Sequence, residues 1–128
     1  MFFILVLYTL FIPNQEGWKT YFQNKKIEIS YRSKVCDDKK NGFSFEYYII
    51  RVENKTNETF VINFILGKEE KENDEDKIAF VLNPNETKTG TCDYNSINLK
   101  MFKSENRNNY SKSKNKFALT KIDVIEVY

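Results

Sequence analysis

Apolar and polar side chains alternate with a period of two residues from residue 18 onward, which is the pattern of half-buried β-strands. Residues 27–35, IEISYRSKV, show it clearly, because Ile27 and Ile29 fall on one face and the polar residues beside them fall on the other. The alternation, together with the turn residues between the runs, predicts strands over 27–35, 43–54, 59–67, 77–82, 87–92, 97–102 and 117–128.

The run FSFEYYIIRVEN over residues 43–54 changes its apolar face part of the way along. Phe45 and Tyr47 share one face, whereas Ile50 and Val52 share the other. The switch near Tyr48 predicts either a β-bulge or a strand that is buried on both sides.

Polar segments separate the predicted strands. NKTNE (54–58) is predicted to be a hairpin connection, and NPNE (83–86) to turn the chain so that TKTGTC runs back beside KIAFVL. KEEKENDEDK (68–77) and KSENRNNYSKSKNK (103–116) are too polar for a core and are predicted to be loops. With about seven short strands and no predicted helix, we expect an all-β fold, an antiparallel β-sandwich.

Two segments, YYIIRVENKT and VLNPNETKTGTC, carry a resemblance to a known type of domain. Each strand ends in Asn, a hydroxyl residue follows, and Leu-x-Pro leads into the next strand. In this the chain resembles the small immunoglobulin-like β-sandwich domains of exported bacterial proteins, over residues 27–128. The antibody-type Cys…Trp…Cys arrangement is missing, because Trp18 precedes both cysteines. The resemblance implies a fold and no activity.

The first twelve residues, MFFILVLYTLFI, form an uncharged apolar run that ends at Pro13. As a helix it would span about 18 Å, less than the ~30 Å of a bilayer core, so we expect no stable membrane span. Its length fits a secretory signal, although no Lys or Arg precedes it, and Gly17 is the best candidate for the residue before a cleavage site. The alternative is a buried first strand. We predict a signal-like segment over 1–17 and one sandwich domain over 18–128.

Composition narrows the possible chemistry. The chain of 128 residues has a net charge of only +2, which argues against a dedicated nucleic-acid binder. It contains no histidine, and this removes the commonest general base and the commonest zinc ligand. It holds no glycine-rich phosphate loop or nucleophile elbow either. We therefore predict no catalytic, cofactor-binding or metal-binding residue.

The two cysteines are Cys36 and Cys92, each followed by an aspartate. An even cysteine count in an exported chain favours a disulfide. A reactive thiol would need a neighbouring cation or a helix N-terminus, and the aspartates oppose formation of a thiolate. We predict a structural disulfide between Cys36 and Cys92, with two free thiols as the alternative.

An acidic run and a basic run could each bind ions. The acidic run lacks the central glycine and the closing glutamate of a calcium loop, so a solvated loop is the favoured interpretation; its members are Glu69, Glu70, Glu72, Asp74, Glu75 and Asp76. The basic run could hold an anionic glycan or a phosphate backbone, although a polar loop is again favoured; its members are Lys103, Arg107, Tyr110, Lys112, Lys114 and Lys116.

Four Asn-x-Ser/Thr sequons fall in predicted turns or loops, where a glycan would fit. Their asparagines are Asn54, Asn57, Asn85 and Asn109. They matter only in a host that glycosylates exported proteins.

The sequence therefore predicts a small periplasmic or secreted domain that is not an enzyme. A non-catalytic binding or accessory domain is the first hypothesis, with an unidentified protein or glycan partner and exposed aromatics such as Tyr48 or Tyr94 at the contact. An inhibitor or immunity-type protein that blocks a secreted enzyme is the alternative. A carboxylate-based hydrolase comes last, because no pair of carboxylates stands out.

Overall fold

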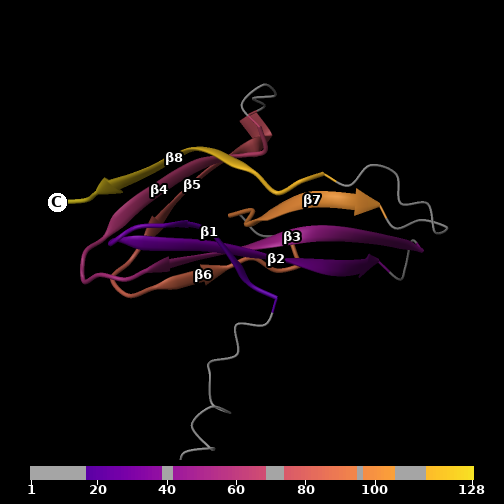
Figure 1. Ribbon diagram of the computed structural model, residues 1–128, viewed down its shortest axis with the longest axis horizontal. Helices are drawn as coiled ribbons and strands as arrows, with labels where there is room; N and C mark the ends of the chain where they lie inside the picture. Colours follow the sequence, from indigo (N-terminus) through magenta and orange to yellow (C-terminus); the bar gives the residue numbers. More distant parts are fainter. Residues whose placement is uncertain (1–16, 39–41, 69–73, 95–96, 106–114) are drawn as a thin grey trace, which may run out of the picture.

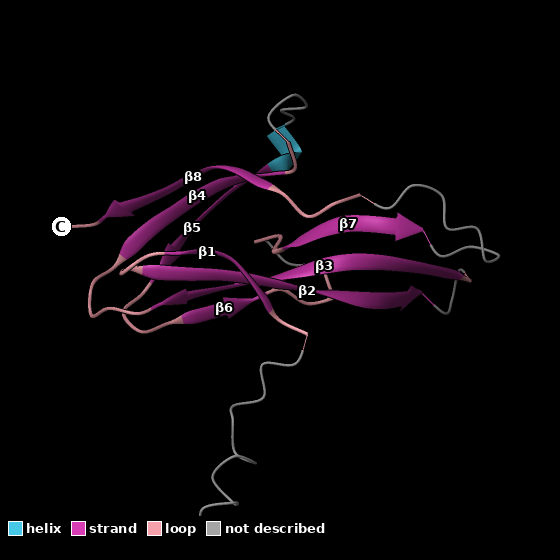
Figure 2. Cartoon of the chain, viewed as in Figure 1, coloured by secondary structure: helices cyan, strands magenta, loops and turns pink. Residues whose placement is uncertain are grey.

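The computed structural model describes residues 17–38, 42–68, 74–94, 97–105 and 115–128. Within these residues the chain forms eight strands and one short 3-10 helix, Asp74–Asp76 (Figure 2). The strands are β1 (Lys19–Gln23), β2 (Ile27–Asp38), β3 (Phe43–Asn54), β4 (Phe60–Leu66), β5 (Lys77–Leu82), β6 (Thr87–Thr89), β7 (Lys100–Glu105) and β8 (Leu119–Glu126).

The strands form two antiparallel sheets that pack against each other. The long sheet has the order β1-β2-β3, and β6 and β7 pair one after the other with the far side of β3. The short sheet has the order β5-β4-β8. Figure 1 shows the short sheet lying over one half of the long one, so that β2, β3 and β7 extend past it. The predicted all-β antiparallel sandwich is confirmed.

The core lies between the two inner faces. β4 contributes Phe60, Ile62 and Phe64, which are at most 1% exposed. β2 and β3 contribute the aliphatic side chains opposite them, of which Ile27, Ile29, Ile50 and Val52 are fully buried. At about 25 cal/mol per Å² of apolar surface removed from water, a cluster of this size is the main stabilising term of the fold.

The predicted change of face in β3 is confirmed, and both proposed causes operate. The register of β3 against β7 shifts between Glu46 and Tyr47, as it does at a β-bulge. Beyond it, Tyr48 and Ile50 point to the inner side, and Ile49 between them is still only 2% exposed. The middle of β3 is therefore buried on both sides, which explains its continuous apolar run.

The two predicted hairpins at NKTNE and NPNE are wrong. β3 and β4 lie in different sheets, and so do β5 and β6, so each segment carries the chain from one sheet to the other. β6 pairs with β3 over three residues, Thr87–Thr89, and not with β5. Turn residues mark where a strand ends, but they do not specify which sheet the next strand joins.

One buried side chain, Asn54, joins these two crossings. It is 2% exposed, and its Nδ2 donates to the carbonyl oxygens of Glu58 (2.7 Å) and Asn83 (2.9 Å). Its Oδ1 accepts hydrogen bonds from the amide and the hydroxyl of Thr56, at 2.9 and 2.8 Å. We call this arrangement the Asn54 corner. One side chain thus bonds backbone groups of both crossings and holds them together.

Several strands differ in extent from prediction; β2, for example, continues to Asp38, three residues beyond the predicted run 27–35. β1 was not predicted as a separate strand; its residues are largely exposed and show little alternation. β6 is half the predicted length, because the chain leaves β3 at Gly90. β7 begins at Lys100 and continues to Glu105, so the start of the predicted basic loop is strand.

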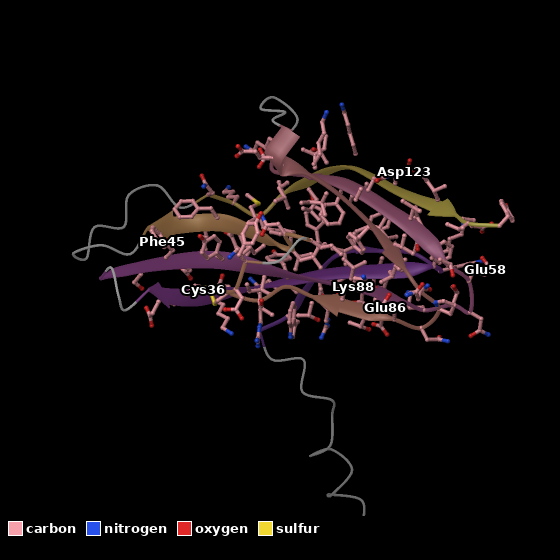
Figure 3. The ribbon with its side chains drawn as sticks, turned by 180° about the vertical axis from the view of Figure 1, so that it is seen from behind. Cys36, Phe45, Glu58, Glu86, Lys88 and Asp123 are labelled. Atoms are coloured by element: carbon pink, nitrogen blue, oxygen red, sulfur yellow. A yellow bond between two sulfur atoms is a disulfide. The ribbon has the colours of Figure 1, made fainter. Side chains whose placement is uncertain are left out.

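Cys36 and Cys92 form the predicted disulfide, with their Cα atoms 5.6 Å apart. Cys36 is 9% exposed and lies toward the end of β2 that extends past the short sheet, near Phe45 (Figure 3). A bridge of this kind is compatible with an oxidising, extracytoplasmic compartment.

We expect native protein to take up no iodoacetamide label without reductant, because both sulfur atoms are bonded to each other. Protein that has been reduced and unfolded should take up two labels, one for each cysteine. Intact-mass spectrometry measures both states, and labelling of the native, unreduced protein would contradict the bridge.

Two predictions concern the ends of the domain and the membrane. Most of the signal-like segment 1–17 lies outside the described residues, which begin at Gly17. The part of the chain that the structure describes holds no helix with the length and apolar character that a membrane crossing needs.

Candidate functional site

A cavity of about 530 Å³ lies on the long sheet. It is lined by residues of β1, β2, β3 and β7 and by the segment that leads into β8. Four cationic side chains reach it from positions far apart in the sequence: Lys19, Arg32, Lys103 and Lys116. We call it the basic cavity.

Aromatic rings form the wall of the basic cavity. Tyr31 stacks on Phe117, with ring centroids 4.0 Å apart and planes 12° apart. Tyr48 meets both rings edge to face, at 5.7 Å from Tyr31 and 5.3 Å from Phe117. Tyr21 of β1 packs edge-on against Phe117 at 5.1 Å. Contacts of this kind add about 0.5–1.5 kcal/mol per pair beyond the buried area, so they hold the wall in one arrangement.

The same contacts place Lys116. Its neighbour Phe117 is fixed by the aromatic stack. Its other neighbour is Asn115, whose backbone carbonyl oxygen accepts a hydrogen bond from the Tyr48 hydroxyl (2.6 Å). The backbone N–H of Asn115 donates to the carbonyl oxygen of Lys103 (3.0 Å). Because both neighbours are anchored to the long sheet, the exposed Lys116 side chain starts from a fixed backbone position at the rim.

Lys103 is less exposed than Lys19 and Lys116 and has three partners. Its Nζ donates to Ser33 Oγ at 2.8 Å and forms an ion pair with Glu46 at 3.1 Å. It also lies 5.2 Å from the centroid of the Tyr48 ring, within the range of a cation–π contact. The position of this ammonium group is therefore set by the protein itself.

Arg32 is held by stacking. Its guanidinium lies 4.9 Å from the Trp18 ring, and the guanidinium of Arg51 lies 4.3 Å from the same ring. Arg32 Nε is buried and has no hydrogen-bond partner among the described residues. Stacking thus orients the guanidinium without neutralising its charge.

The balance of charge at the basic cavity is positive. Among the described residues, Lys103 is the only one of the four cations that has a carboxylate within ion-pair distance. No carboxylate belongs to the described lining, which otherwise consists of the aromatic rings, Ser33 and Gly17. Partly desolvated cations attract anions more strongly than cations in open water do. The lining can therefore offer positive charge and hydrogen-bond donors to a negatively charged group.

A second cavity of about 700 Å³ lies next to the first and shares Lys116 with it. Its lining includes Lys68, Lys100 and one carboxylate, Asp76. Lys100 is held there by a hydrogen bond to the carbonyl oxygen of Cys92 (2.9 Å) and lies 4.7 Å from the centroid of the Tyr47 ring. The positive charge of the basic cavity thus continues past Lys116.

Sequence reasoning found part of this site. Lys103 and Lys116 belong to the basic run, and the structure brings both to the basic cavity, but Arg107, Tyr110, Lys112 and Lys114 lie outside the described residues. Lys19 and Arg32 were missed, because nothing in their local sequence marks them. They lie near Lys103 only through the pairing of β1, β2, β3 and β7.

The two aromatics predicted at an exposed contact have different outcomes. Tyr94 is 95% exposed, as predicted. The prediction for Tyr48 is wrong, since it is 8% exposed and its hydroxyl is bonded to Asn115. It supports the wall of the basic cavity instead.

The sequons divide into three groups. Asn54 was predicted to have room for a glycan, but this is wrong, because its amide is buried and fully bonded in the Asn54 corner. Asn57 and Asn85 are exposed, and Asn85 Nδ2 donates to Asn57 Oδ1 at 2.9 Å. Asn109 lies outside the described residues.

The acidic run is described in part. Asp74, Glu75 and Asp76 form the 3-10 helix, whereas Glu69, Glu70 and Glu72 lie outside the described residues. In the described ranges, no group of three or more Cys, Asp or Glu side chains is placed to hold a metal ion.

Comparisons of the chain with protein-family models, with curated proteins and with solved structures find no match.

Proposed function

We propose that this chain is a non-catalytic binding domain, exported to the periplasm or secreted, that holds negatively charged groups of a protein or glycan partner in the basic cavity. The observation that carries the proposal is the grouping of Lys19, Arg32 and Lys116 around an aromatic wall without a described carboxylate beside them. Arginine and tyrosine are enriched at protein interfaces, and both contribute here.

The chemistry of the lining supports binding rather than catalysis. It supplies cations, hydroxyl groups and rings, and the chain has no histidine to act as a general base near neutral pH. The disulfide supports export, since bridges persist in oxidising compartments.

The first test is binding of two anions with unrelated backbones, a heparin-derived oligosaccharide and a fluorescein-labelled oligoglutamate peptide. At least one should bind to the full chain, and the binding should weaken as salt rises, because salt screens the cations. We expect the double variant Lys19→Glu, Lys116→Glu to lose at least about tenfold in affinity, because it places two negative charges on the rim of the cavity.

The matched control is Lys25→Glu, Lys55→Glu. Each double variant exchanges two exposed lysines and takes the net charge from +2 to −2, because each substitution subtracts two charges. Lys25 lies two residues before Ile27, and Lys55 follows Asn54, the residue that pairs with Ile27, toward the end that Glu58 marks in Figure 3. Equal loss in both variants, or no binding of either anion, would show that the basic cavity is not a binding site.

A further inference from the structure

The edge of β2 beside the basic cavity has a described neighbouring strand along less than half of its length. β2 pairs with β3 over all of Ile27–Asp38, but β1 pairs with it only from Glu28 to Tyr31. Figure 1 shows β1 turning away from β2 while β2 continues toward the end of the long sheet. No described strand lies along the edge at residues 32–38.

Hydrogen-bond alternation identifies which backbone groups face this edge. In antiparallel pairs, successive residues point their N–H and C=O alternately toward one neighbour and the other. Ile50 of β3 bonds Leu99 and Gly90 on its far side, so its partner Tyr31 points away from β3. The same alternation directs the N–H and C=O groups of Ser33, Val35 and Asp37 toward the open edge.

The side chains over the first part of the open edge, Arg32–Val35, are suited to an acidic strand, whereas Asp37 carries a negative charge near its far end. Arg32 and Ser33 line the basic cavity, exposed Lys34 follows them, and Lys103 Nζ lies 2.8 Å from Ser33 Oγ. Val35 is 46% exposed and offers an apolar contact. A strand added here would lie about 4.8 Å from β2, with its side chains alternating between the two faces of the sheet.

We propose that a protein partner binds by adding an extended acidic segment to the open edge of β2, as a continuation of the row begun by β1. Backbone hydrogen bonds to Ser33, Val35 and Asp37 supply affinity, and carboxylates of the segment next to Arg32, Lys34 and Lys103 supply selectivity. This inference rests on the proposed function and deepens it, because it names the class of partner and its conformation.

The experiment compares two labelled peptides on the full chain. The first is a decapeptide of alternating threonine and glutamate, and the second is the same peptide N-methylated at two consecutive central residues. The second keeps every charge, but it interrupts the hydrogen-bonding edges on both sides of the peptide. We expect the first to bind and the second to bind at least about tenfold more weakly.

A pair of variants tests the protein side. Val35→Pro removes one N–H that faces the open edge and keeps the hydrogen bonds to β3, so an edge position should tolerate it. Val35→Thr is the control, because it retains that N–H and the preference for strand. We expect at least about tenfold loss of peptide affinity in the first variant and less than about twofold in the second, with thermal melts showing that both fold.

The outcomes separate the two proposals. Equal binding of the methylated and unmethylated peptides, with the charge variants still weakened, would overturn strand addition and leave anion binding standing. Failure of the threonine–glutamate peptide to bind, while the heparin oligosaccharide does, would also overturn it. If none of the anions bound to the full chain, both the proposed function and this inference would be overturned. The Val35→Pro result is interpreted together with the result for the methylated peptide. The peptide comparison uses the unaltered protein, so it does not depend on the folding of a variant.

Discussion

Replacing Gly90 with alanine is expected to lower the free energy of unfolding by about 4 kcal/mol or more, which places it among the most damaging single substitutions. The backbone N–H of Gly90 donates a hydrogen bond to the carbonyl oxygen of Ile50. At this point of β3 the pairing with β6 ends, and the residues that lead into β7 become its neighbours. A methyl group on Gly90 would overlap the carbonyl oxygen of Leu99 and lie 2.8 Å from its carbonyl carbon. Backbone atoms cannot rotate out of the way, so the backbone at Gly90 or at Leu99 would have to shift.

The matched control is Gly42→Ala. Gly42 has a positive φ of 69°, but no atom lies within 4 Å of the added methyl group, so we expect a loss of only about 1 kcal/mol from backbone strain. Urea unfolding of the disulfide-bonded proteins measures both values. If Gly90→Ala were no more damaging than Gly42→Ala, the close approach of Gly90 and Leu99 would be wrong.

Replacing Asn54 with aspartate is expected to cost about 4 kcal/mol at pH 7, the second of the two large effects. The substitution hardly changes the volume, but it puts a carboxylate oxygen where Nδ2 now donates to the carbonyl groups of Glu58 and Asn83. The new carboxylate oxygen can only accept hydrogen bonds, and it would face carbonyl oxygens that also can only accept them. Asn54→Ala should cost less, about 2–3 kcal/mol, because it removes the hydrogen bonds of the corner without adding a charge.

Asn83→Ala provides the control for the Asn54 corner. Asn83 is exposed and serves the corner through its backbone carbonyl, which alanine retains. We expect its unfolding free energy to stay within about 0.5 kcal/mol of the parent. Of the three variants, compared by urea unfolding at one pH, Asn54→Asp should be the least stable. An Asn54→Asp protein as stable as Asn83→Ala would contradict the hydrogen bonds of the corner.

Periodicity predicted strands well and connections poorly. The bounds of β3 match the predicted run 43–54, because its apolar side chains alternate on a buried surface. The crossings between sheets were mistaken for hairpins, because Asn and Pro stop a strand equally in both cases. Asn54 continues the inward series of Ile50 and Val52, so its burial could have been read from the same alternation.

The basic cavity was less predictable than the fold. Its aromatic wall combines Tyr31 and Tyr48 with Phe117, which lies near the final strand. Such contacts depend on sheet order and on the unequal lengths of the two sheets, and neither follows from local pattern. Lys103 and Lys116 were visible as part of a basic run, but a run of charge in one dimension does not show which cations share a cavity.

The pairing of β4 with strands on both sides has a consequence for biosynthesis. β5 follows β4 closely in the chain, whereas β8 comes only after β5, β6 and β7. A nascent chain therefore reaches β8 late, and closing so distant a pair is slow. Until then the short sheet is an unfinished hairpin that leaves Phe60, Ile62 and Phe64 without their full cover. We therefore expect the domain to complete its fold only after its last strand, β8, has become available to pair with β4.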